Sequence, residues 1–385
     1  MPKPPNELTC GAERSRLAPA SNSFERHDQG PDLQITVRCS CDSGTVIERP
    51  INFERPRRLR CGSCRHEWRV TPEWLDRFNQ ALEACPVCGT DCQSEDRPDF
   101  CAEPEDPSHD DSAVRGSHWY HSSTHENWPD RKFDPATGLD DVTKRRMEAR
   151  GCGVAAWADR QRTKALHVGT YEAAIENMFR RMNHEGSGGD QFYLYRVQLH
   201  PDCLIEPGVH REPTNFVGDA HLAEVCAPGV TVFRYVNVHE DPSNVSLAID
   251  PDAIRAVQRV PVPLPVDATN PWVLTATAQL SDAASQPPPQ PKGKLQRWRQ
   301  REVSALASEA RRLELEVAAR LPLTLRARFT AGFDEAGFEV VPAAFPMKLV
   351  GLARLVLGPR AVLDALDGQR WRLLHPVGGE AVVPR

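Results

Sequence analysis

No apolar run in the sequence approaches the roughly eighteen residues that a membrane-spanning helix needs. The first residues, "MPKPPNELTCGAERSRLAPASNS", also contain no apolar stretch of the kind that a secretory signal carries. These two absences favour a cytoplasmic protein without membrane contact. In that compartment the twelve cysteines are expected to be thiols or metal ligands rather than disulfides.

Several common catalytic signatures are also missing. The glycine-rich stretch "EGSGGD" lacks the G-x-G-x-x-G spacing and precedes a strand-like segment, which argues against a dinucleotide fold of the Rossmann kind. The sequence contains no P-loop, no G-x-S-x-G elbow and no H-E-x-x-H helix. A net charge of −6 argues against non-specific binding of nucleic acid over the whole surface, but it leaves room for a local basic patch.

The 385 residues are enough for two or three domains, and composition divides them. We predict a disordered arm over 1–32, a zinc-binding module over 33–92, an acidic linker over 93–116, a folded domain over 117–280, a proline-rich linker over 281–294 and a mainly helical region over 295–385. The last region opens with an amphipathic helix, because apolar residues recur there at helical spacing: Trp298, Val303, Leu306, Ala310, Leu313 and Val317.

Most of the cysteines lie in one block, "RCSCDSG…RLRCGSCRHEWRV…ACPVCGTDC". Its two C-x-x-C pairs, Cys61/Cys64 and Cys85/Cys88, are separated by twenty residues and supply four thiolates at the spacing of a tetrahedral zinc site. Gly89 favours a turn that directs backbone N–H groups toward sulfur. The block resembles zinc-ribbon and treble-clef modules, in which a C-x-x-C-x-H-x-W stretch precedes C-P-x-C-G. We therefore expect bound zinc.

The ligand role of Cys39 and Cys41 is left open by the spacing. They can complete a first site with the first C-x-x-C pair, and the second pair would then use Cys92, His66 or Cys101. One or two zinc ions are expected accordingly. In so short a segment the metal mainly supplies the stability that a small core lacks.

The stretch "RPRRLRCGSCRHEWR" gathers arginines around the first pair, so contact with nucleic acid is plausible, beside a purely structural role. A catalytic zinc is disfavoured, because four thiolates close the coordination sphere and leave no position for water.

Strand-like and helix-like stretches alternate in the segment 117–280. "SHWYHSSTHENWPD" (117–130) predicts a short strand, and "KALHVGTYEAAIENMFRRM" (164–182) predicts a strand, a Gly-Thr corner and a helix beginning near Tyr171. "QFYLYRVQL", "TVFRYVNVHE" and "SNVSLAID" predict further strands. The expected fold class is α+β, with a mixed domain of short strands between a small zinc-binding module and a helical C-terminal region.

In this order the motifs resemble the ADP-ribosyltransferase superfamily, especially the branch that includes rifampicin ADP-ribosyltransferase. That branch begins with a Tyr-His strand followed by small polar residues, matched by "YHSST" at Tyr120 and His121, with Ser-Ser where Gly-Thr is common. Its second strand, corner and Ala-Ala-Ile helix are matched by "LHVGTYEAAI", with His167 near the place of the usual tyrosine. "FYLYRVQL" and "LIEPG" follow, and "RYVNVHED" offers Glu240 as the acidic third element. The resemblance covers residues 117–260.

The resemblance implies transfer of ADP-ribose from NAD, in which positive charge develops on the ribose as the bond to nicotinamide breaks. Glu240 would stabilise this charge or orient a hydroxyl, His121 would bind a ribose hydroxyl, and His167 would flank the nicotinamide. Asp241 and Ser246 remain alternatives to Glu240 as the third element. The residues expected to contact NAD are Tyr120, His121, Ser122, His167, Gly169, Thr170 and Tyr171.

These expectations describe an NAD-dependent ADP-ribosyltransferase that modifies an intracellular target, nucleic acid or protein, as a toxin or defence effector would. The zinc module would aid target recognition. A second hypothesis is a non-catalytic zinc-ribbon adaptor that binds nucleic acid or protein. The spatial arrangement of the predicted site residues distinguishes the two hypotheses, because the enzyme requires His121, His167 and Glu240 to line one cleft. The sequence leaves the oligomeric state open.

Overall fold

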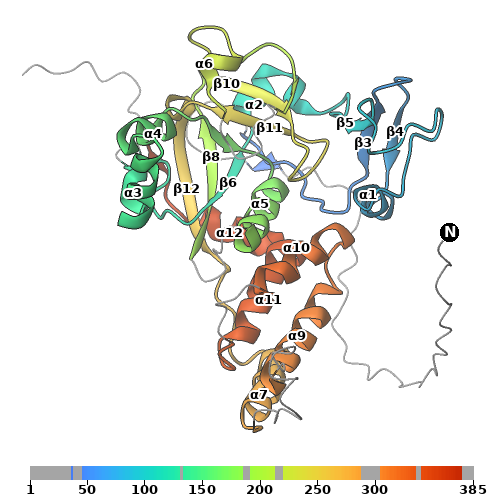
Figure 1. The fold of residues 1–385 in the computed structure, drawn as a ribbon, viewed down its shortest axis with the longest axis vertical. Helices are drawn as coiled ribbons and strands as arrows, with labels where there is room; N and C mark the ends of the chain where they lie inside the picture. Colours follow the sequence, from blue (N-terminus) through green and yellow to red (C-terminus); the bar gives the residue numbers. More distant parts are fainter. Residues whose placement is uncertain are drawn as a thin grey trace, which may run out of the picture. The chain divides into compact units, whose positions relative to one another are not determined.

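The structure is a computed structural model, shown in Figure 1, in which Gln34–Arg385 form one compact unit. It describes residues 36–37, 46–130, 133–184, 191–212, 220–287, 304–334 and 340–374. The predicted arm over 1–32, together with Cys39 and Cys41, lies outside the described residues.

Two four-stranded sheets build the middle of the chain. The first has the order β7-β11-β10-β9, formed by Leu166–Val168, Val245–Ile249, Val232–Val236 and His210–Arg211. The second has the order β13-β12-β8-β6, formed by Arg372–Leu373, Ile254–Val262, Phe192–Leu199 and Trp119–Ser123. Apolar side chains from both sheets, among them Trp119, Val197 and Leu247, share one core. The sheets therefore stabilise each other by burying apolar faces together.

Helix α5 (Tyr171–His184) begins directly after β7, as predicted from the Gly-Thr corner. Its apolar face, with Ile175, Met178 and Phe179, is fully buried in a second core. That core is completed by the C-terminal helices: α7 (Pro271–Ala284), α9 (Ala305–Ala318), α10 (Leu323–Asp334), α11 (Phe345–Leu357) and α12 (Pro359–Asp367). The mixed α+β class and the mainly helical C-terminal stretch are thus confirmed.

The predicted amphipathic helix corresponds to α9. Ala310, Leu313 and Val317 are buried, as their spacing predicts. Trp298 and Val303 lie outside the described residues.

A three-stranded sheet with the order β4-β3-β5 carries the cysteine block (Figure 1). It consists of Glu67–Val70, Arg57–Cys61 and Pro98–Phe100, and helix α1 (Pro72–Asn79) follows β4. We call residues 57–100 the cysteine module. Apart from cysteines, its buried apolar side chains are Leu59, Val70, Leu75 and Pro98, and none of them belongs to the apolar cores formed by the described residues.

Two segments predicted as linkers contain regular structure. The acidic segment 93–116 includes β5, which pairs with β3, and helix α2 (Asp111–Gly116), whose Val114 is fully buried. Its carboxylates are used inside the fold, since Asp106 pairs with Arg49 and Asp111 with Arg234. The proline-rich segment 281–294 begins inside α7, which ends at Ala284.

The remaining described elements are short. They are β1 (Thr36–Val37), β2 (Val46–Ile47), α3 (Asp141–Ala149), α4 (Val154–Arg162), α6 (Leu222–Val225) and the 3-10 turns Pro107–His109, Pro135–Gly138 and Pro251–Ala253. Among the described helices, none has the length and apolar character needed to cross a membrane.

Candidate functional site

The sulfur atoms of Cys61, Cys64, Cys85 and Cys88 all lie within 4.8 Å of one another. The Cys61–Cys88 and Cys64–Cys85 pairs are each 3.6 Å apart between Sγ atoms. A tetrahedral zinc ion with Zn–S bonds of about 2.3 Å places its sulfur ligands about 3.8 Å apart. The donor set and its spacing therefore fit zinc, and these four predicted ligands come together in one group.

The two C-x-x-C pairs form equivalent turns. The N–H of Cys61 bonds the carbonyl of His66 at 2.9 Å, and the N–H of Cys85 bonds that of Thr90 at 2.8 Å. The residue after each pair is in the left-handed region, with φ of 63° at Arg65 and 75° at Gly89. Only the second turn has the glycine that suits this conformation, so the equivalence of the first was not visible in the sequence.

One cavity of about 500 Å³ brings together His121, His167 and Glu240, the three residues predicted to act on NAD. They come from β6, β7 and the loop between β10 and β11, and the backbone bonds between Tyr120 and Gly169 join β6 to β7. Tyr120, Ser122, Gly169 and Ser246 also line the wall. A cavity of this size, with several convergent polar groups, is typical of a small-molecule site.

Both histidines are held neutral. Burial lowers the pKa of His121 to about 3 and that of His167 to about 4. The Nδ1 of His121 lies 2.8 Å from the carbonyl oxygen of His167, so Nδ1 carries the proton and Nε2 is left as an acceptor. The His121 ring stacks on Trp128, with centroids 4.1 Å apart, which fixes the direction of Nε2.

His167 has one engaged and one unengaged nitrogen. Its Nδ1 shares a hydrogen bond of 2.9 Å with the hydroxyl of Tyr235. Its Nε2 is buried and has no hydrogen-bond partner among the residues that the structure describes. Since a buried polar atom without a partner is costly, this nitrogen is available to a ligand in the cavity.

The carboxylate of Glu240 is anchored by helix α5. Its Oε1 accepts hydrogen bonds from Nε of Arg180 at 2.6 Å and from Nδ2 of Asn177 at 3.3 Å. The backbone N–H of Glu240 donates to the Asn237 side chain at 2.9 Å. With 9% of its surface exposed, Glu240 is a nearly buried negative charge whose orientation is fixed from two sides.

A second carboxyl group, Glu212, lies in the same cavity. It follows β9, whose parallel pairing of Arg211 with Val236 sets it beside the start of the β10–β11 loop, where it accepts the N–H of Val238 at 2.9 Å. Burial, and then the charge of Glu240, raise the pKa of Glu212 to about 7. Glu212 is thus poised to exchange a proton near neutral pH.

Two residues predicted to contact NAD do not line the cavity. The Thr170 hydroxyl donates to Asp241 at 2.6 Å and accepts the N–H of Ala173 at 3.0 Å. The Tyr171 hydroxyl donates to the carbonyl of Leu355 at 2.9 Å. Gly169 is needed for packing, because a Cβ there would come within 2.8 Å of both Ala173 and Ser246.

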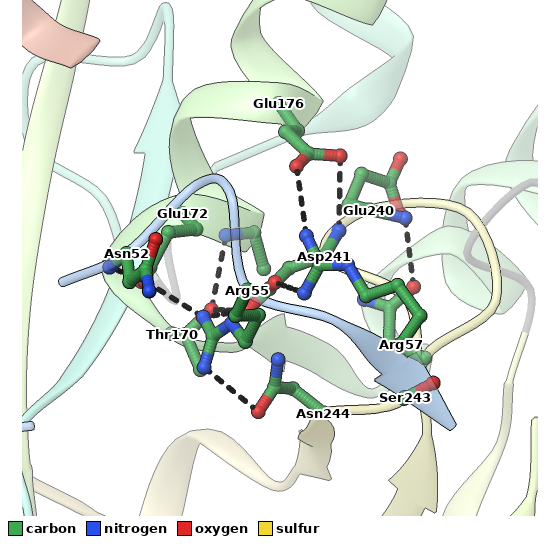
Figure 2. Close-up of polar contacts among 12 residues, drawn as sticks. Asn52, Arg55, Arg57, Thr170, Glu172, Glu176, Glu240, Asp241, Ser243 and Asn244 are labelled. Carbon is green, nitrogen blue, oxygen red and sulfur yellow. Dashed lines mark hydrogen bonds and ion pairs between the residues drawn. The ribbon is translucent and has the colours of Figure 1, made fainter. Parts of the chain in front are cut away.

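The structure places the three candidates for the third element, Glu240, Asp241 and Ser246, in different surroundings. Asp241 is fully buried behind the cavity and forms ion pairs with Arg55 and Arg57, as Figure 2 shows. Ser246 lines the cavity, and its hydroxyl accepts the amide of Asn237 at 3.0 Å. Of the three candidates, Glu240 is the one that brings a carboxylate to the cavity.

The arginine-rich stretch is largely neutralised. Arg55 and Arg57 turn inward to carboxylates (Figure 2), and Arg58 pairs with Glu67 and Glu103. Arg69 also binds Glu103, at 2.8 Å. The electrostatic argument for contact with nucleic acid is therefore weaker than the sequence indicates.

Sequence patterns missed several polar residues of this cavity, among them Asn177, Arg180, Glu212 and Tyr235. Asn177 and Arg180 lie three residues apart on one helix, a spacing that does mark a shared face. Glu212 gave no signal, because it follows a strand of two residues. Comparison of the chain with models of protein families, with curated proteins and with solved structures finds no match.

Proposed function

We propose that the chain is an NAD-dependent ADP-ribosyltransferase that modifies an intracellular target, nucleic acid or protein. The observation that carries this proposal is the convergence of His121, His167 and Glu240 in one cavity, with Glu240 anchored by Arg180. These residues come from three separate segments, and a purely structural role would not require them to share a wall.

The site suits cleavage of the bond between ribose and nicotinamide. The bonding electron pair leaves with the nicotinamide nitrogen, so the pyridinium becomes neutral and positive charge develops on the ribose. The Glu240 carboxylate, held in place before the reaction, would stabilise that charge. The Nε2 of neutral His121 would accept a hydrogen bond from a ribose hydroxyl, and His167 with Tyr235 would flank the nicotinamide.

Transfer also requires a proton acceptor. The acceptor group of the target loses a proton as it bonds to the ribose carbon, and the departing nicotinamide does not take that proton up. Glu212 is suited to receive it, because its pKa of about 7 keeps a useful fraction in the basic form at neutral pH. Glu240 is less suited, because Arg180 and Asn177 already use its Oε1.

Zinc would have a structural role in this enzyme. Cys61, Cys64, Cys85 and Cys88 would supply all four ligands. The half-buried rings of Trp68, Trp74 and Phe78 form a row on the module, with centroids 5.9 and 5.2 Å apart. This row supports a role in target recognition, because exposed aromatic edges bind bases or apolar side chains.

The test is incubation of the zinc-loaded chain with labelled NAD and cell lysate. Wild type should release nicotinamide and label a target, and Glu240→Gln should lower the initial rate about 100-fold or more, because it removes the charge and keeps the shape. Glu224→Gln is the matched control, since Glu224 is exposed and outside the cavity.

The hypothesis of an ADP-ribosyltransferase would be rejected if the wild-type chain, folded and loaded with zinc, released no nicotinamide and transferred no label. The alternative, a non-catalytic zinc-ribbon adaptor, predicts this result together with retention of nucleic acid or protein from the lysate. Loss of that retention on alanine substitution of Trp74 would then identify the module as the binding surface.

A further inference from the structure

A buried network of charges joins strand β3 of the cysteine module, and Arg55 just before it, to the loop that carries Glu240 (Figure 2). Arg55 binds Glu172 at 2.7 Å and Asp241 at 2.8 Å, and Arg57 binds the other oxygen of Asp241. Arg328 binds Glu176 at 2.9 Å. Three arginines thus face three carboxylates, so the charges balance, as buried charges must.

The β10–β11 loop, residues 237–244, depends on these contacts for its shape. Asp241 and Ser243 have φ of 52° and 70°, in the left-handed region that residues with a Cβ rarely adopt. Such a conformation persists where surrounding contacts impose it. Around Asp241 those contacts are with Arg55, Arg57 and Thr170.

Ser243 ties the same loop directly to the module. Its hydroxyl accepts the backbone N–H of Arg58 at 3.0 Å and donates to the Arg58 carbonyl at 2.8 Å. Asp241 in turn donates its backbone N–H to Glu176 on helix α5, at 3.0 Å. Glu240 therefore lies between two anchors, because its own loop is fixed by β3 on one side and by α5 on the other.

Strand β3 links these anchors to the metal ligands. It begins at Arg57 and ends at Cys61, so the arginine that binds Asp241 and the first thiolate stand on one strand of five residues. The module buries few apolar side chains, and its order therefore depends strongly on the bound metal.

We propose that Arg55 and Arg57 are positioning residues for Glu240, and that metal in the four-cysteine cluster fixes them through β3. In this view the module is a built-in support of the cavity as well as a surface for a partner. The structural part of the proposal is independent of the function proposed above, and its consequence for catalysis rests on that function.

The first test is hydrogen exchange of the full chain, loaded with zinc or stripped by a chelator, followed by mass spectrometry. Removal of zinc should raise the hydrogen-exchange rate of peptides covering residues 237–244 at least several-fold. The exchange rate of peptides from the cysteine module should rise as well. Peptides from β12, in the core between the two sheets, should change little. Faster exchange in the module with unchanged exchange in 237–244 would overturn the coupling.

The second test uses zinc-loaded variants. Arg55→Gln and Asp241→Asn should raise the exchange of 237–244 and lower kcat about 10-fold or more, with a smaller change in KM for NAD. Asparagine keeps the shape of Asp241 and tolerates its backbone conformation. Arg69→Gln is the matched control, because Arg69 lies on strand β4 of the cysteine module and binds Glu103, which is not part of the 237–244 loop. Arg57→Lys, which keeps the charge, should retain more activity than Arg57→Gln.

The two proposals fail in different ways. A wild-type chain without transferase activity would reject the function, and the exchange experiment would still decide the coupling. An active wild type whose kcat is unchanged in both Arg55→Gln and Asp241→Asn would reject the positioning role and leave the function standing.

Discussion

The cysteine module and the two-sheet domain bury very different amounts of apolar surface. In the module, Leu59, Val70 and Leu75 are buried beside the cysteines, whereas the core between the sheets includes residues such as Trp119, Leu247 and Ile249, each fully buried. The domain can therefore stabilise itself by the hydrophobic effect. We expect the module to depend on a metal held by its four cysteines, because so few apolar residues cannot offset the entropy of ordering its turns.

The two regions also use charge differently. In the cavity, burial keeps His121 and His167 neutral, and the Nε2 of His167 has no hydrogen-bond partner among the described residues, so it is available to a ligand. At the edge of the module, Arg55 and Arg57 remain charged and bind Asp241, and their charges hold its pKa below the usual value although burial alone would raise it. Buried polar groups thus mark a candidate binding surface in one region and a joint between elements in the other.

Removing a metal ligand should have the largest effect. Cys64→Ser should lose one zinc equivalent per chain and unfold the module, since binding of a structural zinc contributes several kcal/mol to folding. Metal analysis and limited proteolysis would measure this change. Cys152→Ser is the control, because Cys152 is exposed and outside the cluster. Equal zinc content in both variants would contradict the conclusion that the cysteine module, unlike the two-sheet domain, is stabilised by a metal.

Truncating the domain core should separate the two sources of stability. Leu247→Ala should lower the free energy of unfolding by about 3 kcal/mol, because it opens a cavity at a fully buried site. Its zinc content should match that of wild type. Chemical denaturation with parallel metal analysis tests both points, and zinc loss in this variant would show that the module does not hold its metal independently of the core.

Deprotonation of Glu212 should determine how the transfer rate rises on the acidic side of the pH–rate profile. Its pKa is raised to about 7, so the transfer rate should rise with pH through that region as the base form accumulates. Glu212→Gln should lower the rate about 100-fold and abolish this rise. Initial rates from pH 5.5 to 8.5 would measure it. A rise that persists in the variant would assign the proton acceptor elsewhere.

The smallest effect concerns His121 and stability. Its folded pKa of about 3 lies below the ordinary 6.5, so on acidification the unfolded chain takes up a proton before the folded chain does. The free energy of unfolding should therefore fall as pH is lowered from 7 to 5, and less so in His121→Gln. Urea titrations at both pH values test the difference. His109→Gln is the control, since that histidine is exposed. Identical falls in wild type and His121→Gln would contradict a buried neutral imidazole.

Local patterns predicted the elements well. The Gly169-Thr170 corner predicted the end of β7 and the start of α5, and the spacing of Ala310, Leu313 and Val317 predicted the buried face of α9. The two C-x-x-C pairs likewise predicted the four-cysteine cluster, because ligand spacing along the chain directly limits which thiolates can meet.

Patterns that depend on distant partners were harder to interpret. The acidic segment 93–116 reads as a linker by composition, yet β5 pairs with β3 and Asp111 binds Arg234. Arg55 and Arg57 read as part of a basic surface, although the structure turns them toward Asp241. Charge in a sequence does not indicate exposure when an opposite charge far along the chain is brought beside it.

By itself the sequence determined the four thiolates, the strand–corner–helix unit at His167 and the amphipathic C-terminal helix, since each depends on neighbours within a few turns of chain. The tertiary structure decided that His121, His167, Glu212 and Glu240 share a cavity, and that Asp241 is a buried anchor. Those outcomes follow from strand order, in which β9 lies beside β10 and β7 beside β11. The pairing of strands depends on the burial of whole sheet faces, so short sequence motifs do not predict it.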